Sequence, residues 1–300
     1  MEISNDSFKS GYVALVGQPN VGKSTLLNAL LQYHLSIISP KPQTTRQRVL
    51  GILTEPDCQM VFLDTPGLLA PAYRLQEVMM KHAWAATKNA DVILYLCQSG
   101  AWPDPKDLEF LAQIKATGNP VVLAINKIDL VKKNDLLLLI DAFVRHTGFE
   151  DIVPISALHN QNIDDLKQVL QKNLPFGPPY YDSETITEHP ERFFVAELIR
   201  EQIFLRYSEE IPYSTAVVIE EFREQPDKKD FIKARIIVER DSQKAIIIGK
   251  GGHALRRVGQ EARQSIERLL ERPVFLELWV VVREKWRLKD VFIKSFGYDQ

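Results

Sequence analysis

GQPNVGKS, the stretch from Gly17 to Ser24, decides the fold of the first half of this chain. It lies between the apolar run 12–17 and residues 23–31, whose apolar positions have helical spacing. Between a strand and a helix, G-x-x-x-x-G-K-S surrounds a polyphosphate with backbone N–H groups and the positive end of the helix dipole. Lys23 would then contact the β- and γ-phosphates, and the Ser24 hydroxyl would bind Mg²⁺. We assign to a nucleotide site Gly17, Gln18, Pro19, Asn20, Val21, Gly22, Lys23, Ser24 and Thr25.

A second motif, Asp64-Thr65-Pro66-Gly67, follows the apolar run 59–63. The Asp64 carboxylate can hold Mg²⁺, directly or through water, and the Gly67 N–H can reach the γ-phosphate. We add to the nucleotide site Asp64, Thr65, Pro66, Gly67 and Leu68.

A third motif, Asn126-Lys127-Ile128-Asp129, follows the run 121–125. The Asp129 carboxylate only accepts hydrogen bonds, so it matches the two N–H donors of guanine, whereas adenine would face it with an unpaired acceptor. Asn126 can brace the loop or contact the base, and Lys127 can lie along the base. Ser156 and Ala157, after the run 152–155, fit a backbone donor for the guanine oxygen. The three motifs in this order predict a guanine-nucleotide domain.

Alternating strands and helices set the architecture of this domain. Short apolar runs occupy residues 12–17, 59–63, 92–97, 121–126 and 152–155, with helical stretches between most of them. Such alternation predicts an α/β fold with a mostly parallel sheet and helices on both faces. The motifs fall at the carboxyl ends of the strands, where ligands bind in such folds.

The bulk composition is that of a soluble protein with two domains. A length of 300 residues exceeds what one core organises, and 45% hydrophobic with 25% charged residues is ordinary for globular proteins. Cys58 and Cys97 lie in apolar runs and are expected to be reduced core thiols. Neither a membrane span nor the apolar stretch of a signal peptide is present, so we expect a cytoplasmic protein.

The C-terminal part has a different pattern. After the Pro-rich stretch LPFGPPYYDSETITEHPE come a helix near 193–207, two alternating strands, a glycine loop, a second helix and a third strand. This order predicts a small α+β domain. We expect a nucleotide-binding domain at 8–175, a linker at 176–190, the second domain at 191–290 and a tail at 291–300.

IIIGKGG, residues 246–252, is a second glycine-rich loop. It is too short to surround a triphosphate, but it contains G-x-x-G, the loop with which KH domains hold about four nucleotides of a single strand. The overall charge of −2 gives no global attraction to nucleic acid, yet residues 231–270 hold 9 basic and 4 acidic residues. The predicted RNA site comprises Lys244, Ile248, Gly249, Lys250, Gly251, Gly252, Arg256 and Arg257. The alternative is a helix-capping turn beside a solvated basic face.

The nucleotide motifs resemble the signatures of the translation-factor-like GTPases. The run from Ser39 to Arg46 is similar to their first switch, in which a threonine binds Mg²⁺ in the GTP state; this role falls to Thr44 or Thr45, and we favour Thr45. By this resemblance Ser24, Thr45 and Asp64 hold Mg²⁺, and the catalytic set is Lys23, Thr45, Asp64 and Gly67.

Leu68 stands where Ras-like GTPases carry the glutamine that orients water, and leucine cannot hold a water. We expect slow intrinsic hydrolysis. Some relatives with an apolar residue here and an asparagine at the position of Asn20 use K⁺ where others use an arginine finger. The resemblance thus suggests that K⁺ stimulates hydrolysis. The alternative is a protein that binds GTP and hardly hydrolyses it.

Together the two halves resemble the Era family of bacterial GTPases, most closely at residues 175–201 and 246–263. This implies a P-loop GTPase domain followed by a type II KH domain. It also implies GTP and GDP as ligands, and small-subunit ribosomal RNA near its 3′ end and the 30S subunit as partners, in subunit assembly. Family members are mainly cytoplasmic, and some associate peripherally with membrane. The tail VFIKSFGYDQ departs from the family, and its aromatic residues have no assigned role.

We further expect GTP to govern RNA binding by ordering the loops around Thr44–Thr45 and Gly67–Leu68. Two alternatives stay open: an RNA anchor whose nucleotide domain is a static scaffold, and a GTPase that docks a protein or membrane through its basic domain. Nothing in the sequence demands more than a monomer.

Overall fold

The computed structural model describes residues 7–100 and 103–299. Ala101–Trp102, inside the first predicted domain, and Gln300, the end of the predicted tail, lie outside the described residues. Packing divides the chain into two compact units. The first comprises the described residues through Ser36, with Thr45–Ala70 and Met79–Glu188. The second comprises Ile37–Thr44, Pro71–Val78 and the described residues from His189 onward.

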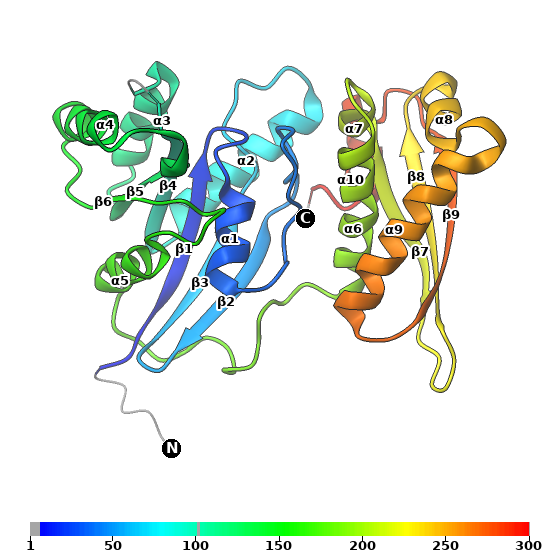
Figure 1. The fold of residues 1–300 in the computed structure, drawn as a ribbon, viewed down its shortest axis with the longest axis horizontal. Helices are drawn as coiled ribbons and strands as arrows, with labels where there is room; N and C mark the ends of the chain where they lie inside the picture. Colours follow the sequence, from blue (N-terminus) through cyan, green and yellow to red (C-terminus); the bar gives the residue numbers. More distant parts are fainter. Residues whose placement is uncertain (1–6, 101–102, 300) are drawn as a thin grey trace. The chain divides into compact units, whose positions relative to one another are not determined.

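The first unit contains a six-stranded sheet (Figure 1). Its order is β2 (Val49–Glu55), β3 (Cys58–Asp64), β1 (Lys9–Gly17), β4 (Val92–Gln98), β5 (Val121–Asn126) and β6 (Ile152–Pro154). All neighbours are parallel except β2, which pairs antiparallel with β3. The mostly parallel sheet is confirmed. β2 is a strand that the sequence pattern did not predict, because Gly51 interrupts it; a Cβ there would lie 2.6 Å from Leu31 Cδ1.

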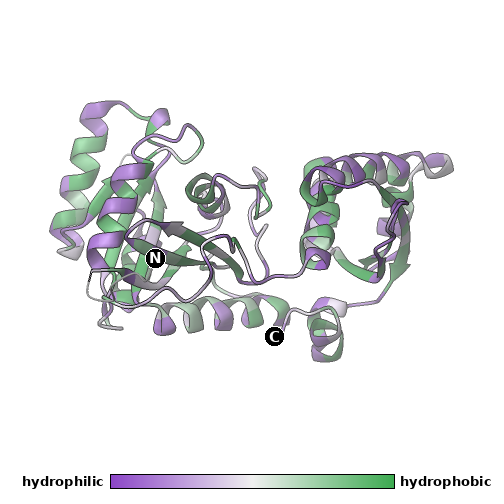
Figure 2. Cartoon of the chain, turned by 90° about the horizontal axis from the view of Figure 1, so that it is seen from below, coloured by the Kyte–Doolittle hydropathy of each residue, from purple (hydrophilic) through white to green (hydrophobic). Residues whose placement is uncertain are grey.

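Helices connect these strands: α1 (Lys23–Leu31), α2 (Arg74–Asn89), α3 (Pro105–Lys115), α4 (Lys133–Thr147) and α5 (Ile163–Asn173), with the short 3₁₀ helix η1 (Ile128–Leu130). α1 contacts α5 and the strands β2 and β3, while α3 contacts α4 (Figure 1). The strands of this sheet are mostly hydrophobic, whereas the helices have hydrophobic and hydrophilic residues (Figure 2). This is the pattern of a sheet buried on both faces.

The second unit is built on a three-stranded sheet of β7 (Ala216–Arg223), β8 (Asp230–Val238) and β9 (Val274–Val282). β7 pairs antiparallel and β9 parallel with the central β8. α6 (Glu191–Arg206) and α9 (His253–Leu270) contact each other and the sheet. The predicted stripe on α9 is buried at Val258, Ala262 and Ile266, all with no exposed area. The small α+β domain is therefore confirmed.

Several short elements complete this unit: α7 (Ile211–Ser214), α8 (Asp241–Ile248), η2 (Lys250–Gly252), η3 (Trp286–Leu288) and α10 (Asp290–Ser295). Two of the unassigned aromatic residues of the tail pack on a buried tryptophan, and one of them, Tyr298, is itself buried. Phe296 and Tyr298 pack against the buried Trp286, with ring centroids 5.5 and 5.8 Å away. The Trp286 indole donates to the Ser214 carbonyl at 2.8 Å.

The stretch expected as a linker lies partly on the first unit. The Ile52 amide donates to the Ile186 carbonyl at 2.8 Å, and the Gln59 side chain donates to the Tyr181 carbonyl at 2.8 Å. Tyr181 and Ile186 therefore lie beside β3 and β2, and the stretch belongs to the first unit as far as Glu188. Within the described residues, no helix is both long enough and apolar enough to cross a membrane.

Candidate nucleotide and RNA sites

The phosphate loop joins β1 to α1 and can be built only with glycine at its two ends. Gly17 and Gly22 have φ of +148° and +102°. A Cβ at Gly17 would lie 2.1 Å from the Leu96 carbonyl oxygen, and one at Gly22 would lie 2.4 Å from Asn126 Nδ2. Side chains at either place would fill the space through which the loop turns into α1. Thr25 lies in the first turn of that helix and is partly buried.

Lys23, the first residue of α1, points back into the loop. Its Nζ donates to the Gly17 carbonyl at 3.1 Å and to the Gln18 carbonyl at 2.9 Å. Burial lowers the pKa of Lys23 to about 8, against the opposing charges of Asp64 and Asp107. A buried ammonium that donates hydrogen bonds to two neutral carbonyls is suited to bind phosphate oxygens.

The three predicted magnesium ligands, Ser24, Thr45 and Asp64, lie within hydrogen-bond distance of one another next to Lys23. The Ser24 hydroxyl donates to Asp64 Oδ2 at 2.9 Å and lies 2.9 Å from Thr45 Oγ1. The Thr45 hydroxyl lies 3.3 Å from the same carboxylate oxygen. Thr44 instead presents its backbone carbonyl to Arg200. This geometry supports Thr45 over Thr44.

The donor set fits Mg²⁺. Asp64 is fully buried, and its Oδ1 has no hydrogen-bond partner among the residues that the structure describes. Burial raises the pKa of Asp64 although Lys23 and the hydroxyls lower it. A hard cation would remove that penalty and satisfy the orphaned oxygen, and two hydroxyls with one carboxylate are ligands of the kind that Mg²⁺ takes.

The residues after Asp64 close the other side of the phosphate loop. Gly67 passes so near Pro19 that a Cβ would lie 2.7 Å from the proline backbone. The Thr65 hydroxyl donates to the Leu15 carbonyl at 2.7 Å, and the Leu68 amide donates to the Gly17 carbonyl at 2.9 Å. Pro66 is buried, and the Leu68 side chain is only 1% exposed. Leu68 therefore packs in the core rather than facing the phosphates.

The third motif forms one hydrogen-bonded group with its neighbours. Ser156 Oγ donates to Asp129 Oδ1 at 2.5 Å, and this bond holds the pKa of Asp129 below its usual range. Asn126 Nδ2 donates to the Val21 carbonyl at 2.8 Å, while its Oδ1 accepts from the Ala157 amide at 2.9 Å. Of its two expected roles, Asn126 thus takes that of brace. Asp129 stays charged and held, as a guanine acceptor should be.

Lys127 and Asn20 are also brought together. Lys127 Nζ donates to the Asn20 carbonyl at 2.8 Å and to Gln98 Oε1 at 3.2 Å. Asn20 has φ of +65° and an exposed side chain. A hydrogen bond thereby connects the phosphate loop directly to the Asn126–Asp129 motif.

The second glycine loop lies between α8 and α9. Gly249, Gly251 and Gly252 have φ of +69°, +58° and +76°. A Cβ at Gly249 would lie 2.6 Å from Ala254 Cβ, while nothing lies within 4 Å of one at Gly252. The expectation of a tight glycine turn between two helices holds, and Ile248 is the last residue of the first helix. Lys250 is exposed at its tip.

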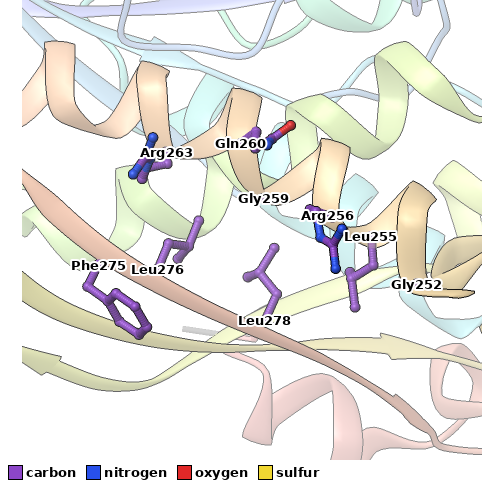
Figure 3. Close-up of a pocket in the computed structure, with 9 residues that line it drawn as sticks. All are labelled: Gly252, Leu255, Arg256, Gly259, Gln260, Arg263, Phe275, Leu276 and Leu278. Carbon is purple, nitrogen blue, oxygen red and sulfur yellow. The ribbon is translucent and has the colours of Figure 1, made fainter.

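A groove of about 420 Å³ runs beside α9 (Figure 3). Its wall on α9 consists of Leu255, Arg256, Gly259, Gln260 and Arg263, its wall on β9 of Phe275, Leu276 and Leu278, and Gly252 lies at one end. Of the predicted RNA residues, Gly252 and Arg256 line it; Arg257 is exposed on α9 and Lys244 is partly buried on α8. Among the residues that the structure describes, Arg256 and Arg263 have no ion-pair partner.

Sequence reasoning missed most of this groove. Arg256, Gly259, Gln260 and Arg263 recur at i, i+3, i+4 and i+7, which places them on one face of α9 beside the buried stripe. That spacing could have revealed them. Phe275, Leu276 and Leu278 gave no signal, because alternating apolar residues are ordinary in a strand.

Comparisons with known proteins agree on both units. A family model described as 50S ribosome-binding GTPase matches residues 12–127, and a KH domain model matches residues 210–287. The GTPase Era of Geotalea uraniireducens is 47% identical over 99% of this chain and 100% of its own length. A crystal structure of an Aquifex aeolicus Era variant bound to GDP and AlF₄⁻ has a TM-score of 0.95 and 43% identity, over 98% of this chain and 100% of that chain. A structure of Era with MgGDPNP and nucleotides 1506–1542 of 16S ribosomal RNA has a TM-score of 0.95 and 44% identity, with the same coverage.

Proposed function

The chain belongs to the Era family of GTPases, and we propose that it is a GTP-dependent switch that acts on the small ribosomal subunit. It hydrolyses GTP to GDP and phosphate and binds Mg²⁺ with the nucleotide. Through its KH domain it binds single-stranded small-subunit ribosomal RNA near the 3′ end, in the GTP state, and so acts in 30S assembly. We place it in the cytoplasm.

One observation carries this proposal: a single chain holds both a buried Ser24–Thr45–Asp64 group behind a phosphate loop and an open groove beside the GKGG loop. The first is suited to a magnesium–nucleotide complex and the second to an unpaired strand. A static RNA anchor would have no use for Asp64 buried at such cost.

In the nucleotide site each residue has a distinct task. The backbone of residues 17–24 and Lys23 would bind the β- and γ-phosphates, and Asp129, held by Ser156, would select guanine. Ser24, Thr45 and Asp64 would hold Mg²⁺, which neutralises charge on the phosphates. The Gly67 N–H would contact the γ-phosphate.

Hydrolysis would be slow without a further cation, since Leu68 is buried and cannot orient water. We propose that K⁺ stimulates it through Asn20, whose side chain is exposed on the phosphate loop. Single-turnover cleavage should be faster in KCl than in NaCl, and Asn20→Ala should remove the difference. Equal rates in the two salts would exclude a role for K⁺.

The RNA assignment is tested by crosslinking in cells followed by sequencing of the bound RNA. We expect reads at the 3′ end of the small-subunit ribosomal RNA, lost in the Lys250→Glu/Arg256→Glu double variant. Lys229→Glu, an exposed cation of the same unit outside the groove, is the matched control and should leave them. Reads that survive in the double variant would show that the groove does not bind this RNA.

Peripheral membrane contact stays a prediction from the family resemblance. Arg283, Lys285 and Lys289 are exposed near the C-terminus, whereas Arg287 is paired with Glu239 at 2.6 Å. Three cations supply only weak attraction to an anionic surface. Co-sedimentation of the full chain with phosphatidylserine vesicles, compared with neutral vesicles, tests the prediction; sedimentation with neither would contradict it.

A further inference from the structure

Asp107 is a buried carboxylate outside the residues already placed in the nucleotide site. It is the third residue of α3 and is only 5% exposed. Tyr95 of β4, which has no exposed area, donates its hydroxyl to Asp107 Oδ1 at 2.6 Å. A charge in such a place is costly unless donors surround it, so the partners of Asp107 indicate what it does.

The second partner of Asp107 is a residue of the phosphate loop. Burial raises the pKa of Asp107, and hydrogen bonds donated by the side chains of Tyr95 and Gln18 lower it. The backbone carbonyl of the same Gln18 accepts from Lys23 Nζ at 2.9 Å. Gln18 thus connects the buried carboxylate with the lysine that is expected to bind the phosphates.

Tyr95 fixes Asp107 relative to the start of the loop. In the sheet β4 is parallel to β1, and Tyr95 pairs in register with Val16, the residue before Gly17. Burial and the charge of Asp107 raise the pKa of Tyr95 well above its usual value, so its hydroxyl remains a donor. The carboxylate is therefore bound to the sheet on one side and to the phosphate loop on the other.

We propose that Asp107 is a positioning residue for the phosphate loop: bound to Tyr95, it fixes the Gln18 side chain and thereby the backbone around Gln18. Its effect on the nucleotide passes through Gln18. The loop is then held at its second residue as well as at its two terminal glycines. This inference rests on the proposed nucleotide binding and adds to it a residue that orders the loop from behind.

The alternative is that Asp107 only stabilises the fold. That role predicts variants with lower thermal stability and unchanged nucleotide affinity. A positioning role predicts an equal loss of affinity for GDP and for a GTP analogue, because the loop binds phosphates that both nucleotides have. Single-turnover hydrolysis at saturating GTP should then stay within about threefold of the parent rate, since the lost interaction is common to the ground state and the transition state.

The test is a double-mutant cycle on the full chain with Mg²⁺ and a fluorescent GDP analogue as the probe. Asp107→Ala and Gln18→Ala should each weaken binding about tenfold, the effect of losing a hydrogen bond to a charged group. The double variant should bind no more weakly than Asp107→Ala, because the two residues act as a pair. Asp107→Asn should recover most of the affinity, since its amide can accept from Tyr95 and donate to the oxygen of Gln18.

Asn119→Ala is the matched control. Asn119 Nδ2 donates to the Thr87 and Ala90 carbonyls at 3.1 and 2.8 Å, so it is a half-buried polar residue of the same unit whose hydrogen bonds lie outside the phosphate loop. Its replacement should lower the melting temperature and leave the affinity for GDP unchanged. Thermal unfolding of every variant identifies any loss of affinity that comes from unfolding.

The outcomes separate this inference from the function on which it rests. Failure of the parent chain to bind GDP would contradict the proposed function. Parent-like affinity of Gln18→Ala, additive losses in the double variant, or a loss in Asp107→Asn as large as in Asp107→Ala would overturn the role of Asp107 alone. Gln18→Ala leaves the hydrogen bond between Tyr95 and Asp107 in place, so it decides the question even if Asp107→Ala does not fold.

Discussion

We propose that Asp129 selects guanine, and Ser156 holds its carboxylate in one place. The hydroxyl of Ser156 occupies Oδ1 at 2.5 Å, and Oδ2 lies 3.8 Å from His159 Nε2. The hydrogen bond from Ser156 holds the pKa of Asp129 below its usual range, so the carboxylate is charged at neutral pH. At the residue scale, the proposed specificity for guanine therefore rests on a carboxylate that stays deprotonated and only accepts hydrogen bonds.

Replacing that acceptor should change the preferred base. Asp129→Asn offers an amide N–H₂ where guanine also offers donors, so affinity for GTP should fall by a factor of ten or more, about 1.4 kcal/mol or above. Xanthosine triphosphate carries an oxygen in place of the guanine amino group and should bind better than GTP. Competition between the two nucleotides measures this, and an unchanged preference for GTP would refute the assignment.

Lys23 links nucleotide binding to pH. Its pKa is lowered to about 8 by burial, whereas in the unfolded chain it is near 10.5. Between these values the unfolded chain binds more protons, so the stability of the nucleotide-free protein should rise with pH in that window. Below pH 8 the buried ammonium costs about 3 kcal/mol.

Phosphate groups should restore the charge of Lys23. GDP binding at pH 9 should therefore take up close to one proton, and at pH 7 close to none from this residue. Calorimetry in two buffers of different ionisation enthalpy gives the number directly. Equal proton uptake at the two pH values would contradict the lowered pKa of Lys23.

At the scale of elements, the turn between α8 and α9 offers a matched pair of glycines. Both Gly249 and Gly252 have positive φ, but only at Gly249 would a Cβ collide with Ala254. Gly252→Ala should cost about 1 kcal/mol of stability and keep RNA binding. Gly249→Ala should deform the loop and weaken RNA binding at least tenfold. Equal RNA affinities of the two variants, measured by fluorescence anisotropy, would show that loop shape does not matter.

The segment Ile37–Thr44 is held by α6 within the second unit. Arg200 Nη2 donates to the Thr44 carbonyl at 2.5 Å, Lys41 Nζ donates to the Tyr207 carbonyl at 2.6 Å, and the Ile38 amide donates to Glu201 Oε1 at 3.1 Å. Arg200 is 1% exposed. Thr45, the next residue along the chain, belongs to the first unit, so this segment is the covalent connection between α6's partners and the predicted Mg²⁺ ligand.

Removing the guanidinium should therefore affect one nucleotide state more than the other. Arg200→Met should weaken binding of a GTP analogue with Mg²⁺ about 5- to 100-fold while GDP affinity stays within twofold, since only the GTP state requires Thr45. Arg192→Met, at an exposed arginine of the same helix, is the control. A parallel loss for both nucleotides would mean that Arg200 serves only stability.

At the scale of the whole molecule, the features that could be predicted from the sequence were those determined by residues close together in the chain. The loop at 17–24 needs glycine at fixed offsets, and the stripe on α9 needs apolar residues at helical spacing, so both could be predicted. The packing of Ile37–Thr44 on α6 brings together residues about 160 positions apart, and no pattern of neighbouring residues predicts such a contact. The exposed Phe275 was missed for the same reason: its stacking partner Phe231 comes near it only through the pairing of β8 with β9.

Coupling between the two sites is the claim on which the account depends. A protein with separate nucleotide and RNA sites becomes a switch only if each ligand changes the affinity for the other by the same factor. The most direct measurement is the affinity of the full chain for RNA of the 3′ end of 16S ribosomal RNA, with Mg²⁺ and either GDP or a non-hydrolysable GTP analogue. We predict binding at least tenfold tighter with the analogue, and analogue binding tightened by RNA to the same extent. Equal RNA affinity in the two nucleotide states would contradict the account.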